Sequence, residues 1–133
     1  MACGAATLLC AVAFAADAPP DFNRDVAPIL RKYCQGCHNA DETNADLRLD
    51  VYDEILKGGE HGAALVPGDA KVSRIIRLTT GQAEPAMPPK DEKQPSPDEI
   101  AVLAAWIDAG AKGPSGDAPA RTLLLTPALA PAK

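Results

Sequence analysis

The sequence predicts an all-α domain, and three observations point to that class. Apolar side chains recur at helical spacing in several separate short segments. The segment Ser96-Pro97-Asp98-Glu99 is a capping box with proline at the first helical position, which is a strong helix start. Glycines follow several of these segments, as they often do where helices end. With 133 residues, the chain is expected to form one such domain.

Residues 1–15 are predicted to be a secretory signal peptide. The segment has no charged side chain, an apolar centre from Leu8 to Phe14, and a final Ala13-Phe14-Ala15 of the A-x-A cleavage type. A transmembrane helix needs about 20 apolar residues, so no stable membrane span is expected. The bulky Leu9 before Cys10 argues against a lipid anchor. We therefore expect export to the periplasm or cell envelope.

The expected mature chain keeps few sulfur or imidazole ligands. They are Cys34, Cys37, His38, His61 and Met87. The net charge of −5 argues against binding to nucleic acid, whose phosphates select basic surfaces. The aromatic content of 4% predicts a thin hydrophobic core, which a large flat cofactor would complete.

The first helix is expected within Asp21 to His38. Its apolar side chains share one stripe, made of Val26, Ile29, Leu30, Tyr33 and Cys34. The two cysteines therefore come at the C-terminal end of this helix, where Gly36 lets the chain tighten.

Two short helices are expected in the middle of the chain. One runs from Val51 to Lys57, with Asp50 as its N-cap and Gly58-Gly59 as its stop. The other runs from Ala70 to about Thr80, with Asp69 as its N-cap. The side chains on its inward face are expected to be Val72, Ile75, Ile76 and Thr79.

A proline-rich loop, Gln82 to Pro95, leads from these helices to a final helix that follows the capping box and ends at Gly110. Residues 113–133 are rich in proline and alanine, which predicts a flexible tail or a linker. The folded domain is therefore expected over residues 20–112.

Cys34-Gln35-Gly36-Cys37-His38 is a C-x-x-C-H pattern, which is typical of covalent haem attachment. Two thiols at this spacing match the two vinyl groups of haem, and the adjacent histidine can then bind the iron from the proximal side. Three competing interpretations fit less well. A thioredoxin-like pair belongs at a helix N-terminus, a zinc site needs four ligands, and a disulfide across this spacing is strained. We expect one covalent haem c.

The sixth iron ligand is expected to be Met87. It is the only methionine left after export, and Pro85, Pro88 and Pro89 stiffen its loop. A methionine that merely fills a core gap is the simpler interpretation. The rival interpretations of the distal side are ligation by His61 and an open iron position.

Basic residues cluster after Pro67-Gly68-Asp69 and after the methionine. Lys71, Arg74 and Arg77 recur at helical spacing, followed later by Lys90 and Lys93. This pattern is compatible with a cationic docking rim on an acidic body, but it favours an ordinary solvated helix face.

Taken in order, these motifs resemble the planctomycete-type cytochrome c domain from about Phe22 to Ala111. Beyond C-x-x-C-H, the resemblance rests on several pieces: Asp25-Val26-Ala27-Pro28-Ile29-Leu30, Leu47-Arg48-Leu49-Asp50, Gly58-Gly59, Pro67-Gly68-Asp69, Ser73, Met87-Pro88-Pro89 and Trp106-Ile107-Asp108-Ala109-Gly110-Ala111. It implies a cytochrome c-like fold, with N- and C-terminal helices packed around the haem. It also implies that Met87 is the distal ligand. Asn39 stands where the family often has glycine.

The expected function is electron transfer with redox partner proteins in the cell envelope, without enzymatic turnover. Two competing functions are a haem-based sensor or peroxidase-like module with an open distal site, and the N-terminal redox module of a larger envelope enzyme. The sensor or peroxidase needs a polar acid–base residue beside the iron, and His61 is the only histidine available for it.

Overall fold

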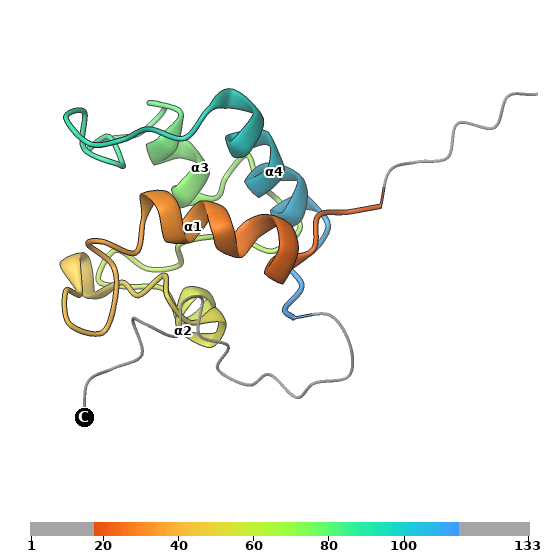
Figure 1. Cartoon of the computed structure of the whole chain (residues 1–133), viewed down its shortest axis with the longest axis horizontal. Helices are drawn as coiled ribbons and strands as arrows, with labels where there is room; N and C mark the ends of the chain where they lie inside the picture. The colour runs from red at the N-terminus through yellow and green to blue at the C-terminus, as the bar shows by residue number, and fades with distance from the viewer. Residues whose placement is uncertain (1–17, 115–133) are drawn as a thin grey trace, which may run out of the picture.

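The computed structural model describes residues 18–114, which fold as short helices joined by loops without a β-sheet (Figure 1). The predicted all-α class is therefore confirmed for this range. None of these helices is long and apolar enough to cross a membrane. The expected signal peptide, residues 1–15, lies outside the described residues, as does the expected tail apart from its first two residues.

The first and last helical segments lie at the centre of the domain. In chain order, the elements are η1 (Phe22–Val26), α1 (Ala27–Tyr33), η2 (Asn44–Asp46), α2 (Tyr52–Lys57), α3 (Arg74–Thr79) and α4 (Pro97–Asp108). In Figure 1, α4 lies beside α1, and α3 and α2 lie toward opposite sides of this pair. The segment η1 contacts α4, and α3 contacts α4 as well.

The N- and C-terminal helices pass each other in opposite directions. Phe22 in η1 packs against Trp106 near the end of α4, with ring centroids 5.5 Å apart. At the other end, the Tyr33 hydroxyl donates a 2.6 Å hydrogen bond to Glu99 Oε1 in the first turn of α4. The two helices therefore touch at both ends, while their packing around a haem stays a prediction.

The first helix begins as a wide π-turn and then continues as an α-helix. Asp21 caps it by accepting a hydrogen bond from the Arg24 amide. The wide turn comes directly before Pro28, which has no amide hydrogen and whose ring would clash with the carbonyl four residues earlier. The helix ends at Tyr33 with Cys34 as its C-cap, so the two cysteines lie at its C-terminal end, as predicted.

Three of the four aromatic rings in residues 18–114 gather in one cluster. Phe22 packs edge-on against Tyr52 at 5.2 Å and also against Trp106. The Trp106 indole donates to the Lys112 carbonyl at 2.8 Å, and the Tyr52 hydroxyl donates to the Ala111 carbonyl at 2.8 Å. These bonds hold the segment after α4 against the cluster. The hydrophobic core therefore has an aromatic centre that the sequence did not predict.

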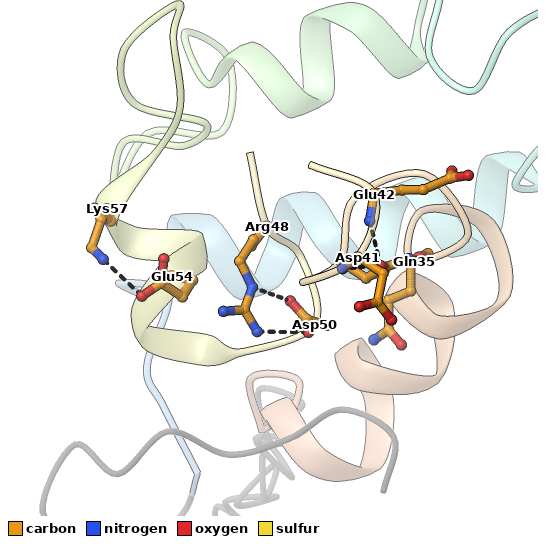
Figure 2. A network of polar contacts seen from close by, with 8 residues as sticks. Gln35, Asp41, Glu42, Arg48, Asp50, Glu54 and Lys57 are labelled. Carbon is orange, nitrogen blue, oxygen red and sulfur yellow. Dashed lines mark hydrogen bonds and ion pairs between the residues drawn. The ribbon is translucent and has the colours of Figure 1, made fainter. Parts of the chain in front are cut away.

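The predicted N-cap of α2 is wrong. Asp50 does not cap the helix. Its two carboxylate oxygens accept from Arg48 Nε at 3.0 Å and Nη2 at 2.9 Å (Figure 2). The helix therefore begins at Tyr52 without a side-chain cap. Its end agrees with the prediction, because Gly58 adopts a φ of 76° there.

The predicted start of α3 is also wrong. The helix begins at Arg74, and residues 70–73 form a turn. The buried Ser73 hydroxyl donates to the Asp69 carbonyl at 2.8 Å and accepts from the Val66 amide at 2.9 Å. A hydroxyl bonded to nearby backbone competes with helix formation. Val72, expected to face inward, is 53% exposed.

The capping box of α4 is confirmed. Ser96 Oγ accepts from the Glu99 amide and Glu99 Oε1 accepts from the Ser96 amide, both at 3.1 Å. Pro97 occupies the first helical position. Beyond the C-cap, Gly110 adopts a φ of 104°, a left-handed conformation that suits glycine.

Candidate functional site

One cavity of about 570 Å³ contains all the predicted site residues. Cys34, Cys37, His38 and Met87 line it together, although Met87 is far from the others in the sequence. The volume lies within the range of about 300–1,000 Å³ that is usual for small-molecule and cofactor pockets. The rival ligand His61 also lines this cavity.

The two cysteines lie on the turn that follows α1. Cys34 is the C-cap, and the amides of Cys37 and His38 donate to its carbonyl at 3.3 and 3.2 Å. Both thiols are free, so the disulfide interpretation does not apply to this structure. Burial raises the pKa of the Cys34 thiol to about 12. A thioredoxin-like cysteine needs the opposite shift and a helix N-terminus, so the geometry disfavours a thioredoxin-like pair.

The His38 imidazole is held by two backbone carbonyls. Its Nδ1 lies 3.1 Å from the Asn44 oxygen and 3.2 Å from the Leu47 oxygen. A carbonyl oxygen can only accept a hydrogen bond, so Nδ1 carries the ring hydrogen. The lone pair of the neutral ring is then on Nε2, where a metal ion can bind it.

The loop that holds His38 has an unusual backbone. Ala45 and Asp46 adopt positive φ angles of 56° and 53°. Gly59 packs directly against this loop, because a Cβ at its position would lie 2.6 Å from the Ala45 oxygen. The Glu60 amide donates to the same oxygen at 2.8 Å. The second glycine of Gly58-Gly59 is therefore required by close backbone approach.

Asn39 holds the turn after His38. Its Oδ1 accepts from the amides of Asp41 and Glu42, both at 2.9 Å, and its amide nitrogen donates to the Gln35 carbonyl. A small polar side chain thus closes this turn through hydrogen bonds to its backbone.

The Leu47-Arg48-Leu49-Asp50 piece alternates between two environments. Leu47 and Leu49 line the cavity. Arg48 and Asp50 form the ion pair described above, and the Asp50 side chain is 1% exposed. In an extended segment, alternate side chains point to opposite faces, which accounts for this pattern. Sequence analysis recognised the motif without identifying the ion pair.

The methionine loop is attached to α3 and closed by one glutamine. The Met87 amide donates to the Leu78 carbonyl at 3.3 Å. Gln94 Nε2 donates to the carbonyls of Pro88 at 3.0 Å and Pro89 at 2.9 Å. Gln94 was not among the predicted site residues. Its only signal was an amide side chain, able to donate to carbonyls, in a loop rich in prolines.

His61 lines the cavity from a different loop than Met87 does. It lies in the turn closed by Gly59 and Gly62, and its exposed ring is 3.8 Å from a Glu60 carboxylate oxygen. The adjacent Glu60 amide ties this turn to Ala45, in the loop that also holds His38. The two candidate distal ligands therefore belong to separately anchored loops.

The predicted basic residues are divided between the cavity and the outer surface. Arg74 and Lys93 line the cavity, together with Lys32, whereas the remaining basic candidates do not. The remaining candidates, all exposed, are Lys71, Arg77 and Lys90.

The donor set fits a covalent haem better than a structural metal ion. Among residues 18–114, no three His, Cys, Asp or Glu side chains are grouped to hold a metal ion, so a four-ligand zinc site has no support. A haem needs only two thiols for attachment and axial ligands on its iron. Cys34, Cys37 and a histidine with its Nε2 lone pair available, beside an ample cavity, meet this need.

Comparison with known proteins gives one family. Residues 34–91 match the family model described as Planctomycete cytochrome C. The search of curated proteins and that of solved structures returned no match. The matched range begins at the first cysteine of the haem motif and includes Met87-Pro88-Pro89. Over this range, the chain matches the planctomycete-type cytochrome c family that its sequence motifs predicted.

Proposed function

We propose that this domain is a mono-haem electron carrier of the cell envelope, with Cys34 and Cys37 holding the haem and with His38 and Met87 as its axial ligands. Membership of a cytochrome c family indicates haem-based electron transfer, covalent haem c and redox partners. The observation that carries the finer proposal is the convergence of these four residues on one cavity.

Cys34 and Cys37 would hold the haem through thioether bonds to its two vinyl groups. The addition of a thiol across a vinyl double bond changes no oxidation state overall, so it would need no oxidant. Cys34 is the C-cap of α1, so the attachment would fix the haem at the end of this helix.

His38 acts as the proximal ligand. Once bound, the haem supplies a reversible one-electron couple of iron. The carbonyls of Asn44 and Leu47 fix the His38 tautomer and increase the basicity of Nε2 by accepting from Nδ1. The same bonds set the orientation of the ring, so the iron meets a preformed ligand.

Met87 is assigned as the distal ligand on the anchoring of its loop. A second iron ligand would have to reach the haem from an anchor separate from that of His38. The His61 turn is tied to the loop that holds His38. Met87 is tied instead to the end of α3 through Leu78. This difference in anchoring supports Met87 and disfavours His61.

An electron carrier accounts for these features better than an enzyme does. A sensor or peroxidase needs an open iron position with an acid–base group beside it. A methionine at that position leaves no place for a substrate. Export, which the family also suggests, and a place in the periplasm or cell envelope complete the proposal.

The experiment is expression of the full chain in a bacterium that matures c-type cytochromes. Intact-protein mass spectrometry should show one haem added, and acid–acetone should leave the pigment on the protein. The Cys34→Ala/Cys37→Ala double variant is the control and should release it. Pigment extracted from the wild-type protein, or a mass without haem, would reject the proposal.

A further inference from the structure

Arg74 is less exposed to water than the other lysine, arginine and acidic side chains that line the cavity. These side chains are Lys32, Arg74, Glu92 and Lys93. Lys32, Glu92 and Lys93 are exposed, whereas Arg74 is half-buried. As the first residue of α3, Arg74 comes from the element that also anchors the methionine loop.

The Arg74 side chain makes no hydrogen bond or ion pair with any other residue in the described range 18–114. Arg48, another partly buried arginine, illustrates the usual arrangement, because it holds the Asp50 carboxylate with two of its nitrogens. A guanidinium presents five donors in a fork, and withdrawing it from water without a partner is costly. The cavity is therefore expected to supply an anion.

The proposed cofactor carries such an anion. Haem has two propionate groups, and the guanidinium fork matches a carboxylate better than an ammonium does. We infer that Arg74 is the counter-ion of a haem propionate and thereby helps to set the reduction potential of the iron. This inference rests on the proposed function, and it adds a residue that neither the haem motif nor the methionine loop contains.

The remaining basic residues near the cavity are weaker candidates. The Lys32 ammonium lies 5.0 Å from the centre of the Tyr33 ring, where it makes a cation–π contact. Lys93 is exposed, so water screens its charge. Arg77, in the same helix as Arg74, is exposed and does not line the cavity. It provides a matched control.

The loss of Arg74 has two consequences of defined sign. An unpaired propionate adds negative charge near the iron, which favours the oxidised form and lowers the reduction potential. The pKa of the propionate also rises, because its anionic form has lost a cation. The pH range over which the potential falls with rising pH therefore moves upward.

Other titratable or charged groups also face the cavity, besides the haem-holding residues. They are Lys32 and Tyr33 from α1, His61 from the glycine turn, and Glu92 and Lys93 from the methionine loop.

The test measures reduction potential against pH on the full-chain holoproteins, after mass spectrometry has established covalent haem in each. Arg74→Gln should lower the potential more than Arg77→Gln or Lys93→Gln, and should move the pH-dependent range upward. His61→Gln removes the other imidazole at the cavity and should leave that range in place. Identical curves of reduction potential against pH for Arg74→Gln and Arg77→Gln would overturn the inference. A larger shift in potential for Lys93→Gln than for Arg74→Gln would also overturn it.

Two further outcomes are decisive. If Arg74→Gln does not accumulate as holoprotein, Arg74→Lys is measured, because a single ammonium should still move the pH-dependent range upward from that of the wild type. A curve identical to the wild type then contradicts the inference. A wild-type protein without covalent haem rejects the proposed function itself, which separates the two failures.

Discussion

The Tyr33 hydroxyl and the Glu99 carboxylate join the two ends of the domain through a 2.6 Å hydrogen bond. Tyr33 is the last residue of α1 and directly precedes Cys34, while Glu99 belongs to the capping box of α4. One carboxylate thus closes a helix cap and attaches the segment that carries the haem motif.

This bond predicts a pH dependence of stability. The hydrogen bond from Tyr33 lowers the pKa of Glu99 below its usual value near 4.5. A carboxylate with a lowered folded-state pKa adds stability above its unfolded pKa, and this stability is lost as the pH falls through the folded value. Tyr33→Phe should therefore lower the melting temperature at pH 7 and have less effect well below pH 4, as thermal unfolding at several pH values would show.

Tyr52→Phe is the control for that experiment. It removes a hydrogen bond of similar length to the Ala111 carbonyl, which does not titrate. Its destabilisation should stay the same between pH 7 and acid pH. If the effect of Tyr33→Phe is equally independent of pH, the coupling to Glu99 is absent.

The two ion pairs in Figure 2 are predicted to differ in strength. Asp50 is 1% exposed, so Asp50→Ala leaves the Arg48 guanidinium partly buried without its partner. We expect a loss of about 2 kcal/mol in unfolding free energy, below the usual cost for a fully buried pair. Glu54→Gln, at the exposed pair with Lys57, should cost less than about 1 kcal/mol. Denaturant titration of the two holoproteins gives both values, and equal losses would contradict the account.

The close approach of Gly59 to Ala45 predicts a steric effect on the proximal loop. The new Cβ of Gly59→Ala would meet the Ala45 oxygen at 2.6 Å and push the loop that holds His38. We expect a loss of about 1–3 kcal/mol, which is typical of overpacking. Gly36→Ala, whose Cβ has no neighbour within 4 Å, should be nearly neutral. The idea fails if the two variants unfold at the same denaturant concentration.

The domain should also fold poorly without haem. A cavity of about 570 Å³ between its helices leaves their apolar sides without a common partner. The Cys34→Ala/Cys37→Ala variant, prepared without haem, should lack a cooperative thermal transition by circular dichroism. Native helicity with a sharp transition in that variant would show that the aromatic cluster of Phe22, Tyr52 and Trp106 is sufficient.

The sequence predicted well those features of the fold that depend only on residues close together in the chain. The capping box at Ser96 and the stripe through Val26 and Leu30 depend on neighbours in the chain, and both agree with the structure. The start of α3 was wrong because Ser73 bonds to Val66, a contact that helix patterns do not reveal. The cap of α2 was wrong because Asp50 has a partner in an extended segment.

Spacing predicted the cysteines and His38 as haem-holding residues, and a short inventory of ligands predicted Met87. The structure brings all four to one cavity, and their roles stay predictions. The carbonyls that orient His38, and the position of Arg74 in the cavity, depend on how loops return to one place. Such contacts have no regular sequence spacing, so they required the structure.

The most direct test of the axial assignment is the absorption spectrum of the oxidised holoprotein, compared with Met87→Ala and His61→Ala. The wild type should show the weak band near the red end of the visible that marks ferric iron bound to a thioether. Met87→Ala should lose this band and, when reduced, bind carbon monoxide, whereas His61→Ala should keep the band. A wild type without the band, together with iron opened by His61→Ala, would contradict the account and make His61 the ligand.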